Sequence, residues 1–288
     1  MKKLITLILT LVLGLAACFS FTACGKDLVG FDTDLAKAVG KELGVTVEFK
    51  EINWDTKEDE LSTKLIDCVW NGFTYTEARD NGYYDEERGR QIGGLDFTGF
   101  YMVNKQVAVV KKSEAANYTS NASFNGKSGC AEATSAGESV IKTVLGANPA
   151  QLEKQLDGLV AVKAGTYDYA VVDLTLASEY VANEKGAYKD SLAIVQLTGV
   201  EEEFYAVGCR EGSNLPAVLN SVLKKLYANG TAQEIAKKYS LDAALYNGFE
   251  NAADLGNLPT DGDVGEIVSR GKIVVGYTIF APMSYFPE

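Results

Sequence analysis

Strand-like and helical segments alternate regularly along most of this 288-residue chain, and this order restricts the possible fold more than any other feature. In the segment 30–44, apolar residues recur at helical spacing, Asp32 is placed to cap the helix and Gly44 to end it. An alternating strand follows at 45–52, and a second helix and a buried strand follow at 55–72. Consecutive units of this kind build parallel-type sheets flanked by helices, so we predict an α/β fold.

A second set of alternating strands and helices follows a charged, glycine-rich excursion at 80–94. The excursion has no clear periodicity and is predicted to lie on the surface. Two long extended segments, Gln106–Lys111 and Phe204–Arg210, bracket the second set. Two lobes joined by two crossover strands would explain this arrangement. We assign the first part of lobe 1, lobe 2 and the second part of lobe 1 to residues 27–105, 106–207 and 208–249.

The end of the sequence does not continue this pattern. Residues 250–262 carry proline, glycine and several acidic side chains, and are predicted to form a linker. Residues 263–288 then read as a short helix, a glycine turn and a strand rich in β-branched residues. No strand follows that could be its neighbour, and an unpaired strand leaves an open edge. We therefore expect the terminal strand to pair with an earlier part of the chain.

The start of the sequence is typical of a secretory leader, with two lysines, an apolar run and small residues before a cysteine. The apolar run is shorter than the roughly 20 residues that a membrane-spanning helix needs. Cys18 and Cys24 both fit a bacterial lipoprotein processing site, and Cys24 is favoured because it lies closer to the folded part. A cleaved leader without lipid is the alternative. Residues 1–24 are thus predicted to be a lipoprotein signal peptide, which places the protein outside the cytoplasm, anchored to the cell membrane.

Composition argues against several classes of function. The net charge is −12 and the pI is about 4.7, which disfavours nucleic acid as a partner because phosphate binding requires basic patches. The sequence contains no histidine, so it lacks the commonest general base and the usual ligand of zinc and iron sites. We predict no metal and no cofactor. Cys68, Cys130 and Cys209 allow at most one disulfide, and their apolar surroundings favour buried thiols.

Several motifs resemble those of the type II solute-binding proteins of ABC importers for polar amino acids. They are the segment from Leu28 through the first helix, "INWD" at 52–55 and "IDCVWNGFTYTEAR" at 66–79. Family members usually begin with a strand like "GKIVVGYTIFAPMSY", which here stands last, at 271–285. The resemblance implies a two-lobe fold like that of periplasmic binding proteins.

The displaced strand has two explanations. In a circular permutant, residues 263–288 would supply the first strand of lobe 1, and the linker at 250–262 would join the usual free termini. In a truncated second copy, lobe 1 would instead lack a central strand and one wall of its site. We favour permutation, because joining Glu288 to Asp27 restores the usual order of the family's motifs.

The resemblance also implies a site for the charged groups of a free amino acid. Arg79, five residues after Thr74, would bind the ligand carboxylate in a bidentate pair. Thr74 would offer its amide and hydroxyl, and the Gly72 carbonyl would accept a hydrogen bond from the ligand ammonium. Asn71, in the same loop, is also predicted to contact the ligand. The alternative for Arg79 is a solvated loop arginine.

The second lobe would complete this site. Ser135 and Ala136 would open a helix whose unpaired amides attract the ligand carboxylate. Asp173, at the end of a strand, would pair with the ligand ammonium. Phe280 and Trp54 would hold the ligand side chain between two rings. Without the resemblance, these residues would be read as helix caps and core rings.

These features imply a substrate-binding lipoprotein of an ABC importer, a monomer that closes on a free polar amino acid and delivers it to the permease. A dehydratase-like enzyme of the same fold and a sensor-type ligand-binding module are the alternatives. The absence of histidine argues against an enzyme. Relatives that prefer cationic ligands often carry an acid just before the position of Phe280, where this chain has "GYTIF". This difference favours an uncharged polar or acidic ligand.

Overall fold

The computed structural model describes residues 27–86 and 88–287. The predicted leader, with its candidate lipidation sites Cys18 and Cys24, lies outside these residues. Across the described ranges, no helix combines the length and the apolar character needed to cross a bilayer.

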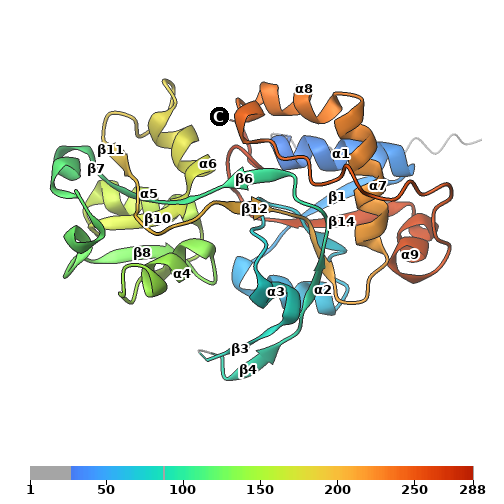
Figure 1. The fold of residues 1–288 in the computed structure, drawn as a ribbon, viewed down its shortest axis with the longest axis horizontal. Helices are drawn as coiled ribbons and strands as arrows, with labels where there is room; N and C mark the ends of the chain where they lie inside the picture. The colour runs from blue at the N-terminus through green and yellow to red at the C-terminus, as the bar shows by residue number, and fades with distance from the viewer. Residues whose placement is uncertain (1–26, 87, 288) are drawn as a thin grey trace, which may run out of the picture.

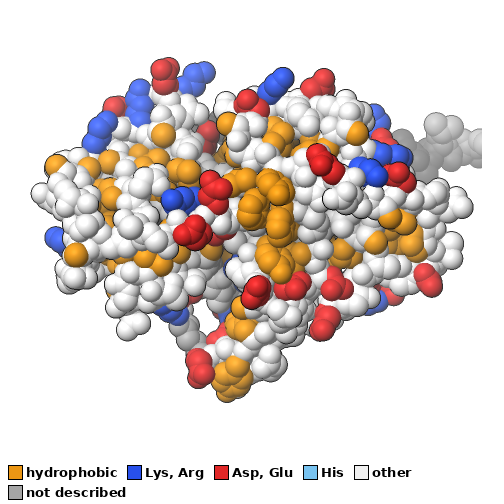
Figure 2. Space-filling view, in the orientation of Figure 1, with side chains coloured by type: hydrophobic (Ala, Val, Ile, Leu, Met, Phe, Trp, Pro, Cys, Tyr) orange, Lys and Arg blue, Asp and Glu red, His pale blue; other side chains and the backbone are white. Residues whose placement is uncertain are grey.

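The chain forms two α/β lobes that lie side by side, drawn as a ribbon in Figure 1 and as a space-filling view in the same orientation in Figure 2. The sheet of the first lobe has the strand order β1-β14-β2-β13-β5. In that order the strands span Thr46–Glu51, Lys272–Tyr277, Cys68–Val69, Gly208–Arg210 and Leu95–Phe97. β14 runs parallel to both of its neighbours, whereas β13 runs antiparallel to β2 and β5.

The sheet of the second lobe has the order β11-β7-β10-β8-β9. In that order the strands span Leu192–Val195, Gln106–Lys111, Tyr169–Asp173, Gly129–Glu132 and Ala150–Leu152. β8 is parallel to β10 and β9, and β7 is antiparallel to β10 and β11. The predicted two-lobe α/β architecture is confirmed, and both sheets also contain antiparallel strands.

Two short strands cross between the lobes. β6 (Met102–Asn104) and β12 (Glu203–Tyr205) form an antiparallel pair, and Figure 1 shows them spanning the space between the two sheets. The prediction that Gln106–Lys111 is a crossing is wrong, because this segment is β7 of the second sheet. The second predicted crossing, Phe204–Arg210, divides between β12 and β13.

Helices flank both sheets. From α1 to α9 they span Phe31–Leu43, Lys57–Ser62, Glu77–Asn81, Ala136–Thr143, Gln155–Ala164, Leu174–Ala177, Leu215–Ala228, Thr231–Lys238 and Gly262–Arg270. Shorter helical turns span Trp54–Thr56, Lys112–Asn117, Asn121–Phe124, Ser178–Ala182 and Asp242–Ala244. Helices α1, α7 and α8 pack against one another on the first lobe.

Helix α1 confirms one predicted end and corrects the other. It ends where predicted, since Gly44 adopts a left-handed conformation with φ 70°. The predicted cap is wrong. The helix is preceded by Gly30, and Asp32 lies buried within the first turn. Its carboxylate accepts hydrogen bonds from distant groups, described below with the pocket.

The excursion at 80–94 is more regular than predicted. It contains an antiparallel hairpin of β3 (Tyr83–Asp85) and β4 (Arg90–Ile92), which projects from the first lobe in Figure 1. Arg90 pairs with Asp59 at 2.5 Å and ties the hairpin to α2.

The terminal strand occupies an internal position in the first sheet. β14 pairs with β1 along its whole length, and Val275 and Gly276 pair with β2. Beyond it, the backbones of Val29 and Tyr285 exchange two hydrogen bonds of 2.9 and 2.8 Å. The expected pairing of the terminal strand with the early part of the chain is therefore present, and the two ends of the described chain lie side by side.

The three cysteines of the described chain are buried free thiols, as predicted: Cys68, Cys130 and Cys209. Burial raises the pKa of each thiol, to about 12 for Cys130. Cys68 and Cys209 lie opposite each other on β2 and β13. They act as small apolar side chains in the core of the first lobe.

Candidate functional site

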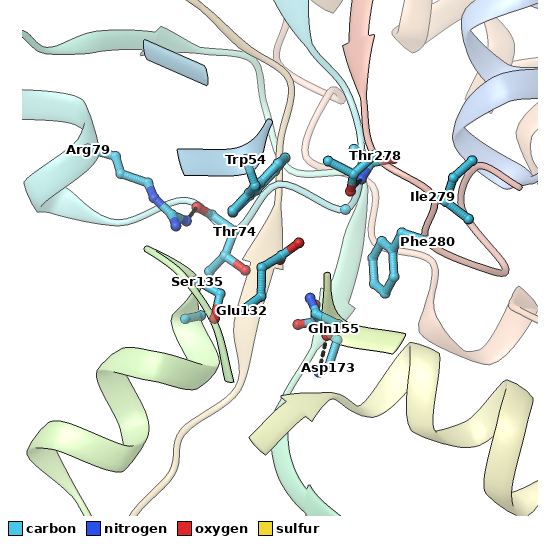
Figure 3. Close-up of a pocket in the computed structure, with 13 residues that line it drawn as sticks. Trp54, Thr74, Arg79, Glu132, Ser135, Gln155, Asp173, Thr278, Ile279 and Phe280 are labelled. Atoms are coloured by element: carbon cyan, nitrogen blue, oxygen red, sulfur yellow. Dashed lines mark hydrogen bonds between the residues drawn. The ribbon is translucent and has the colours of Figure 1, made fainter. Parts of the chain in front are cut away.

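A pocket with about 370 Å³ of atom-free space lies between the lobes (Figure 3). All nine residues that the sequence predicts for the ligand site line it: Trp54, Asn71, Gly72, Thr74, Arg79, Ser135, Ala136, Asp173 and Phe280. Four further residues complete the lining: Glu132, Gln155, Thr278 and Ile279. The residues that the sequence predicts from both lobes therefore meet at one pocket.

The loop after β2 is held in place by a buried acid. Gly72 adopts φ 57°, and a Cβ at this position would lie 2.6 Å from the Phe280 ring, so the loop requires glycine here. The Gly72 amide donates to the Asp32 carboxylate at 2.6 Å, and the Tyr101 hydroxyl donates to the same oxygen at 3.0 Å. Burial raises the pKa of Asp32 to about 7, although both hydrogen bonds lower it. Asp32 therefore positions the loop that forms one wall of the pocket.

Arg79 lies on α3 and is buried, so the alternative of a solvated loop arginine is wrong. Thr76 caps this helix by accepting from the Arg79 amide at 3.1 Å. The guanidinium donates to the Thr74 carbonyl at 2.6 Å and to the Thr134 carbonyl, in the other lobe, at 3.0 Å. It also lies 4.7 Å from the centre of the Phe73 ring. A guanidinium has five N–H donors, so these two bonds leave donors for a ligand carboxylate.

The second lobe contributes the start of α4. The Ser135 hydroxyl accepts from the Glu138 amide at 3.1 Å and caps the helix. The Ser135 hydroxyl is therefore occupied as a helix cap. The unpaired amides of the first turn still favour a negative charge near Ser135 and Ala136. Thr134, just before the cap, adopts φ 58°, a left-handed conformation that is unusual for a β-branched residue.

Asp173 is fixed by an amide network rather than by its helix. It precedes α6 but makes no capping bond through its side chain. Its carboxylate accepts from the side-chain amides of Asn104, Gln106 and Gln155. Glu203 accepts from Asn104 at 2.5 Å and from Gln106 at 2.6 Å, so the two acids share donors. The network thereby ties the pocket to both crossing strands, because Asn104 ends β6 and Glu203 begins β12.

Burial raises the pKa values of both acids in this network. The pKa of Glu203 rises to about 8, and the nearby Asp173 contributes to that rise. The pKa of Asp173 is raised by burial, although the amide bonds lower it. Asp173 and Glu203 together therefore tend to keep a bound proton. A cation placed against Asp173 would favour release of that proton.

Two aromatic rings line the pocket, with Trp54 at the top and Phe280 at the right in Figure 3. Trp54 packs edge-on against Phe73 with ring centres 5.2 Å apart. Phe280 follows β14, and its backbone closes a turn with Ser284. The terminal strand therefore brings an aromatic side chain to a pocket whose other walls come from residues 54–173.

The sequence-based reasoning missed four lining residues. Thr278 and Ile279 directly precede Phe280, and the Asn71 side-chain amide lies 2.8 Å from the Thr278 hydroxyl. Glu132 ends β8, and Gln155 begins α5. The sequence feature that could have identified these residues is their position near the ends of strands. Side chains at the carboxyl ends of parallel strands meet at one edge of a sheet.

The lobes contact each other around the pocket. Lys57, completely buried in the first lobe, donates to the Thr134 hydroxyl of the second lobe at 3.1 Å. Lys154 of the second lobe pairs with Glu51 of the first at 2.7 Å. With the bond between Arg79 and Thr134, these contacts link the two lobes beside the pocket.

Two α/β lobes, two crossing strands and a pocket between them define the class of two-lobe, type II binding proteins. A sequence model of the bacterial extracellular solute-binding proteins, family 3, matches residues 11–242. The chain belongs to this family.

Individual relatives agree with this assignment. The L-cystine-binding protein TcyA of Bacillus subtilis is 27% identical over 222 residues, which cover 76% of each chain. A substrate-binding protein of an ABC uptake transporter from Streptococcus pneumoniae, solved with bound histidine, is 31% identical with a TM-score of 0.63. That match covers 75% of this chain and 85% of the other.

One structural neighbour bears on the alternative of an enzyme. It is an ancestral amino acid-binding protein described as a precursor of cyclohexadienyl dehydratase, 29% identical with a TM-score of 0.62. The match covers 73% of this chain and 84% of the neighbour. The relatives described here are named as binding proteins.

Proposed function

We propose that this protein captures a free polar amino acid between its lobes and delivers it to the permease of an ABC importer. The observation that carries the proposal is the joint presence of Arg79 and Asp173 in one buried pocket. A free amino acid presents a carboxylate and an ammonium a few ångströms apart, and these two side chains complement them. The relatives named for cystine and histidine support the same ligand class.

Binding would proceed by closure of the lobes about β6 and β12. The ligand would first contact Arg79 and Thr74 in the first lobe. The second lobe would then add the start of α4 and Asp173, and the closed form would be the one that the permease binds. The contacts of Arg79 and Lys57 with Thr134 support this mechanism, because they are available only when the lobes meet.

The protein would act as a binding protein and not as an enzyme, working as a monomer without a cofactor. It would be exported by the leader at 1–24 and anchored to the membrane by a lipid on Cys24 or Cys18. The enzyme alternative remains relevant because a dehydratase precursor shares the fold.

A thermal-shift screen of the mature protein against the twenty common amino acids tests the proposal. We expect one or a few polar amino acids to raise the melting temperature, because a ligand that binds only the folded state stabilises it by mass action. Turnover assays with the same compounds should show no consumption. The proposed function would be refuted if no amino acid raised the melting temperature, or if a bound compound were consumed.

We further propose that the chain is a circular permutant, in which residues 263–288 take the place of a first strand. The position of β14 between β1 and β2 and the pairing of Val29 with Tyr285 support this. The lobe boundaries at 27–105, 106–207 and 208–249 belong to the same proposal. The linker at 250–262 has no strand and is largely exposed, which suits a bridge between former termini.

Relinking the chain tests the permutation. A variant that starts at 262, joins Glu288 directly to Asp27 and ends at 250 should fold with a melting temperature within a few degrees of the parent. The reason is that Asp27, Pro287 and the new ends at Glu250 and Gly262 are exposed, and every strand keeps its neighbours. Circular dichroism melts and the thermal-shift screen provide the measurement. Failure of the relinked chain to fold would contradict the permutation.

A further inference from the structure

The pocket contains an acidic side chain that the backbone of a bound amino acid leaves unmatched. Three charged side chains line it: Arg79, Asp173 and Glu132. Each is at least nine-tenths buried, with 8%, 4% and 4% of its surface exposed. The ligand carboxylate and ammonium complement Arg79 and Asp173. Glu132 then has no charged partner on the ligand backbone.

The protein's own cations do not neutralise this excess. The charged groups that face Glu132 are Lys57, Arg79 and Asp173. Lys57 is already paired with Glu58 at 3.2 Å, and its ammonium donates to the Trp54 carbonyl at 3.0 Å. Behind Asp173, Glu203 adds another buried acid. Acidic side chains therefore outnumber cationic ones in the described surroundings of the pocket, and a cation on the ligand side chain would favour the ionised form of Glu132.

The position of Glu132 matches the place expected for the ligand side chain. Figure 3 shows its carboxyl group extending from β8 into the middle of the pocket, on the side of Trp54 and Phe280. Ring faces attract cations as well as flat groups. A guanidinium or ammonium between these rings would thus meet both π faces and a carboxylate.

We propose that Glu132 selects a ligand with a cationic side chain, so that the solute is an amino acid of the arginine or lysine type. This inference rests on the proposed function and names its substrate class. It reverses the expectation of an uncharged polar or acidic ligand, which was based on the absence of an acid from "GYTIF" before Phe280. In this assignment the second lobe supplies the acid that the first lobe lacks there. Glu132 is a specificity-determining residue in this assignment.

The protonation of Glu132 supplies an independent readout. Burial and the nearby Asp173 raise its pKa to about 8, against the lowering effect of Lys57, Gln155 and Arg79. The carboxyl group is therefore largely protonated at pH 7 before the ligand enters. A ligand cation favours the ionised form, so binding releases a proton, and affinity for a cationic ligand rises with pH from 6 to 8.

Isothermal titration with L-arginine, L-lysine and the neutral isosteres L-citrulline and L-norleucine tests the assignment. We expect arginine or lysine to bind at least 10-fold more tightly than its isostere. E132Q should weaken binding of the cationic ligand by roughly 100-fold and reduce the ratio between cation and isostere. E153Q removes one charge from an exposed position of the same lobe and should preserve the ratio. In buffers of different ionisation enthalpy, the wild type should release more protons with the cation than with the isostere, because the ammonium placed against Asp173 is common to both ligands and only the cationic side chain meets Glu132.

Each outcome decides between the two proposals. Tighter binding of a neutral or acidic amino acid overturns the cationic assignment and leaves the proposed function standing. An unchanged ratio in E132Q overturns the role of Glu132. Absence of binding by every amino acid tested refutes the proposed function itself. If E132Q does not fold, proton release by the wild type settles the assignment, because equal release with arginine and citrulline contradicts it.

Discussion

Deletion of residues 271–288 is expected to leave a chain that does not fold. The deleted segment contains β14, whose neighbours β1 and β2 lie on opposite sides of it and would no longer be joined. It also carries five large buried apolar side chains: Ile273, Val275, Tyr277, Phe280 and Met283. Their burial contributes on the order of 10 kcal/mol, since each such side chain adds about 1.5–3 kcal/mol. That sum is comparable with the whole stability of a typical domain, about 5–15 kcal/mol.

A matched pair of point variants separates this effect from simple shortening. Val275 is 1% exposed on β14, and Val268 is 42% exposed on α9. V275D places a charge in the core and is expected to remove about 5 kcal/mol of stability or more. V268D should change stability by less than about 0.5 kcal/mol. Circular dichroism melts and gel filtration report both. A truncated chain that still melts cooperatively near the parental temperature would show that the strand is dispensable.

The periodic parts of the fold were accessible from the sequence because their cause is local. The apolar spacing of α1 and the glycine at Gly44 act within one helix, and both appear where expected. The crossing strands were misplaced for a physical reason. β6 spans only Met102–Asn104, which is too short to show a period. The four central residues of Gln106–Lys111 are all apolar and buried, which is typical of a strand covered on both faces.

The site was predictable where the residues form a recognisable motif and unpredictable where burial decides their chemistry. Arg79 and Asp173 were identified through neighbouring motifs and both line the pocket. In the sequence, Asp32 reads as a helix cap, and no motif marks Glu132 as a site residue. Only the tertiary structure buries them, and burial raises the pKa values of both carboxyl groups. Long-range desolvation of this kind leaves no local pattern in a sequence.

Arg79→Ala is expected to abolish the thermal shift that a bound amino acid produces. The guanidinium is the cation that lines the pocket at the end where Thr74 and Ser135 lie in Figure 3. Without it, the ligand carboxylate would be buried without a charged partner, which costs about 3–5 kcal/mol. Affinity should therefore fall by roughly 1000-fold, since about 1.4 kcal/mol corresponds to a factor of ten. Titration calorimetry with the amino acid that gives the largest shift measures this loss.

The variant also removes the bond from Arg79 to the Thr134 carbonyl, so loss of binding and loss of closure have to be separated. Arg79→Lys keeps the positive charge but replaces the planar fork with a single ammonium. It should bind more tightly than Arg79→Ala and less tightly than the wild type. Arg79→Lys binding as weakly as Arg79→Ala would indicate that the fork geometry, and not the charge, holds the carboxylate.

Arg90→Ala is the matched control, because Arg90 is an exposed arginine that pairs with Asp59 outside the pocket. An exposed pair of this kind contributes little to stability, so neither the melting temperature nor the ligand affinity should change appreciably. If Arg79→Ala retained affinity within about tenfold of the wild type while Arg90→Ala behaved as expected, the carboxylate would have to be held by the amides at the start of α4 alone. Ligand orientation in the pocket would then depend on the helix and Asp173, and the first lobe would contribute mainly its aromatic wall.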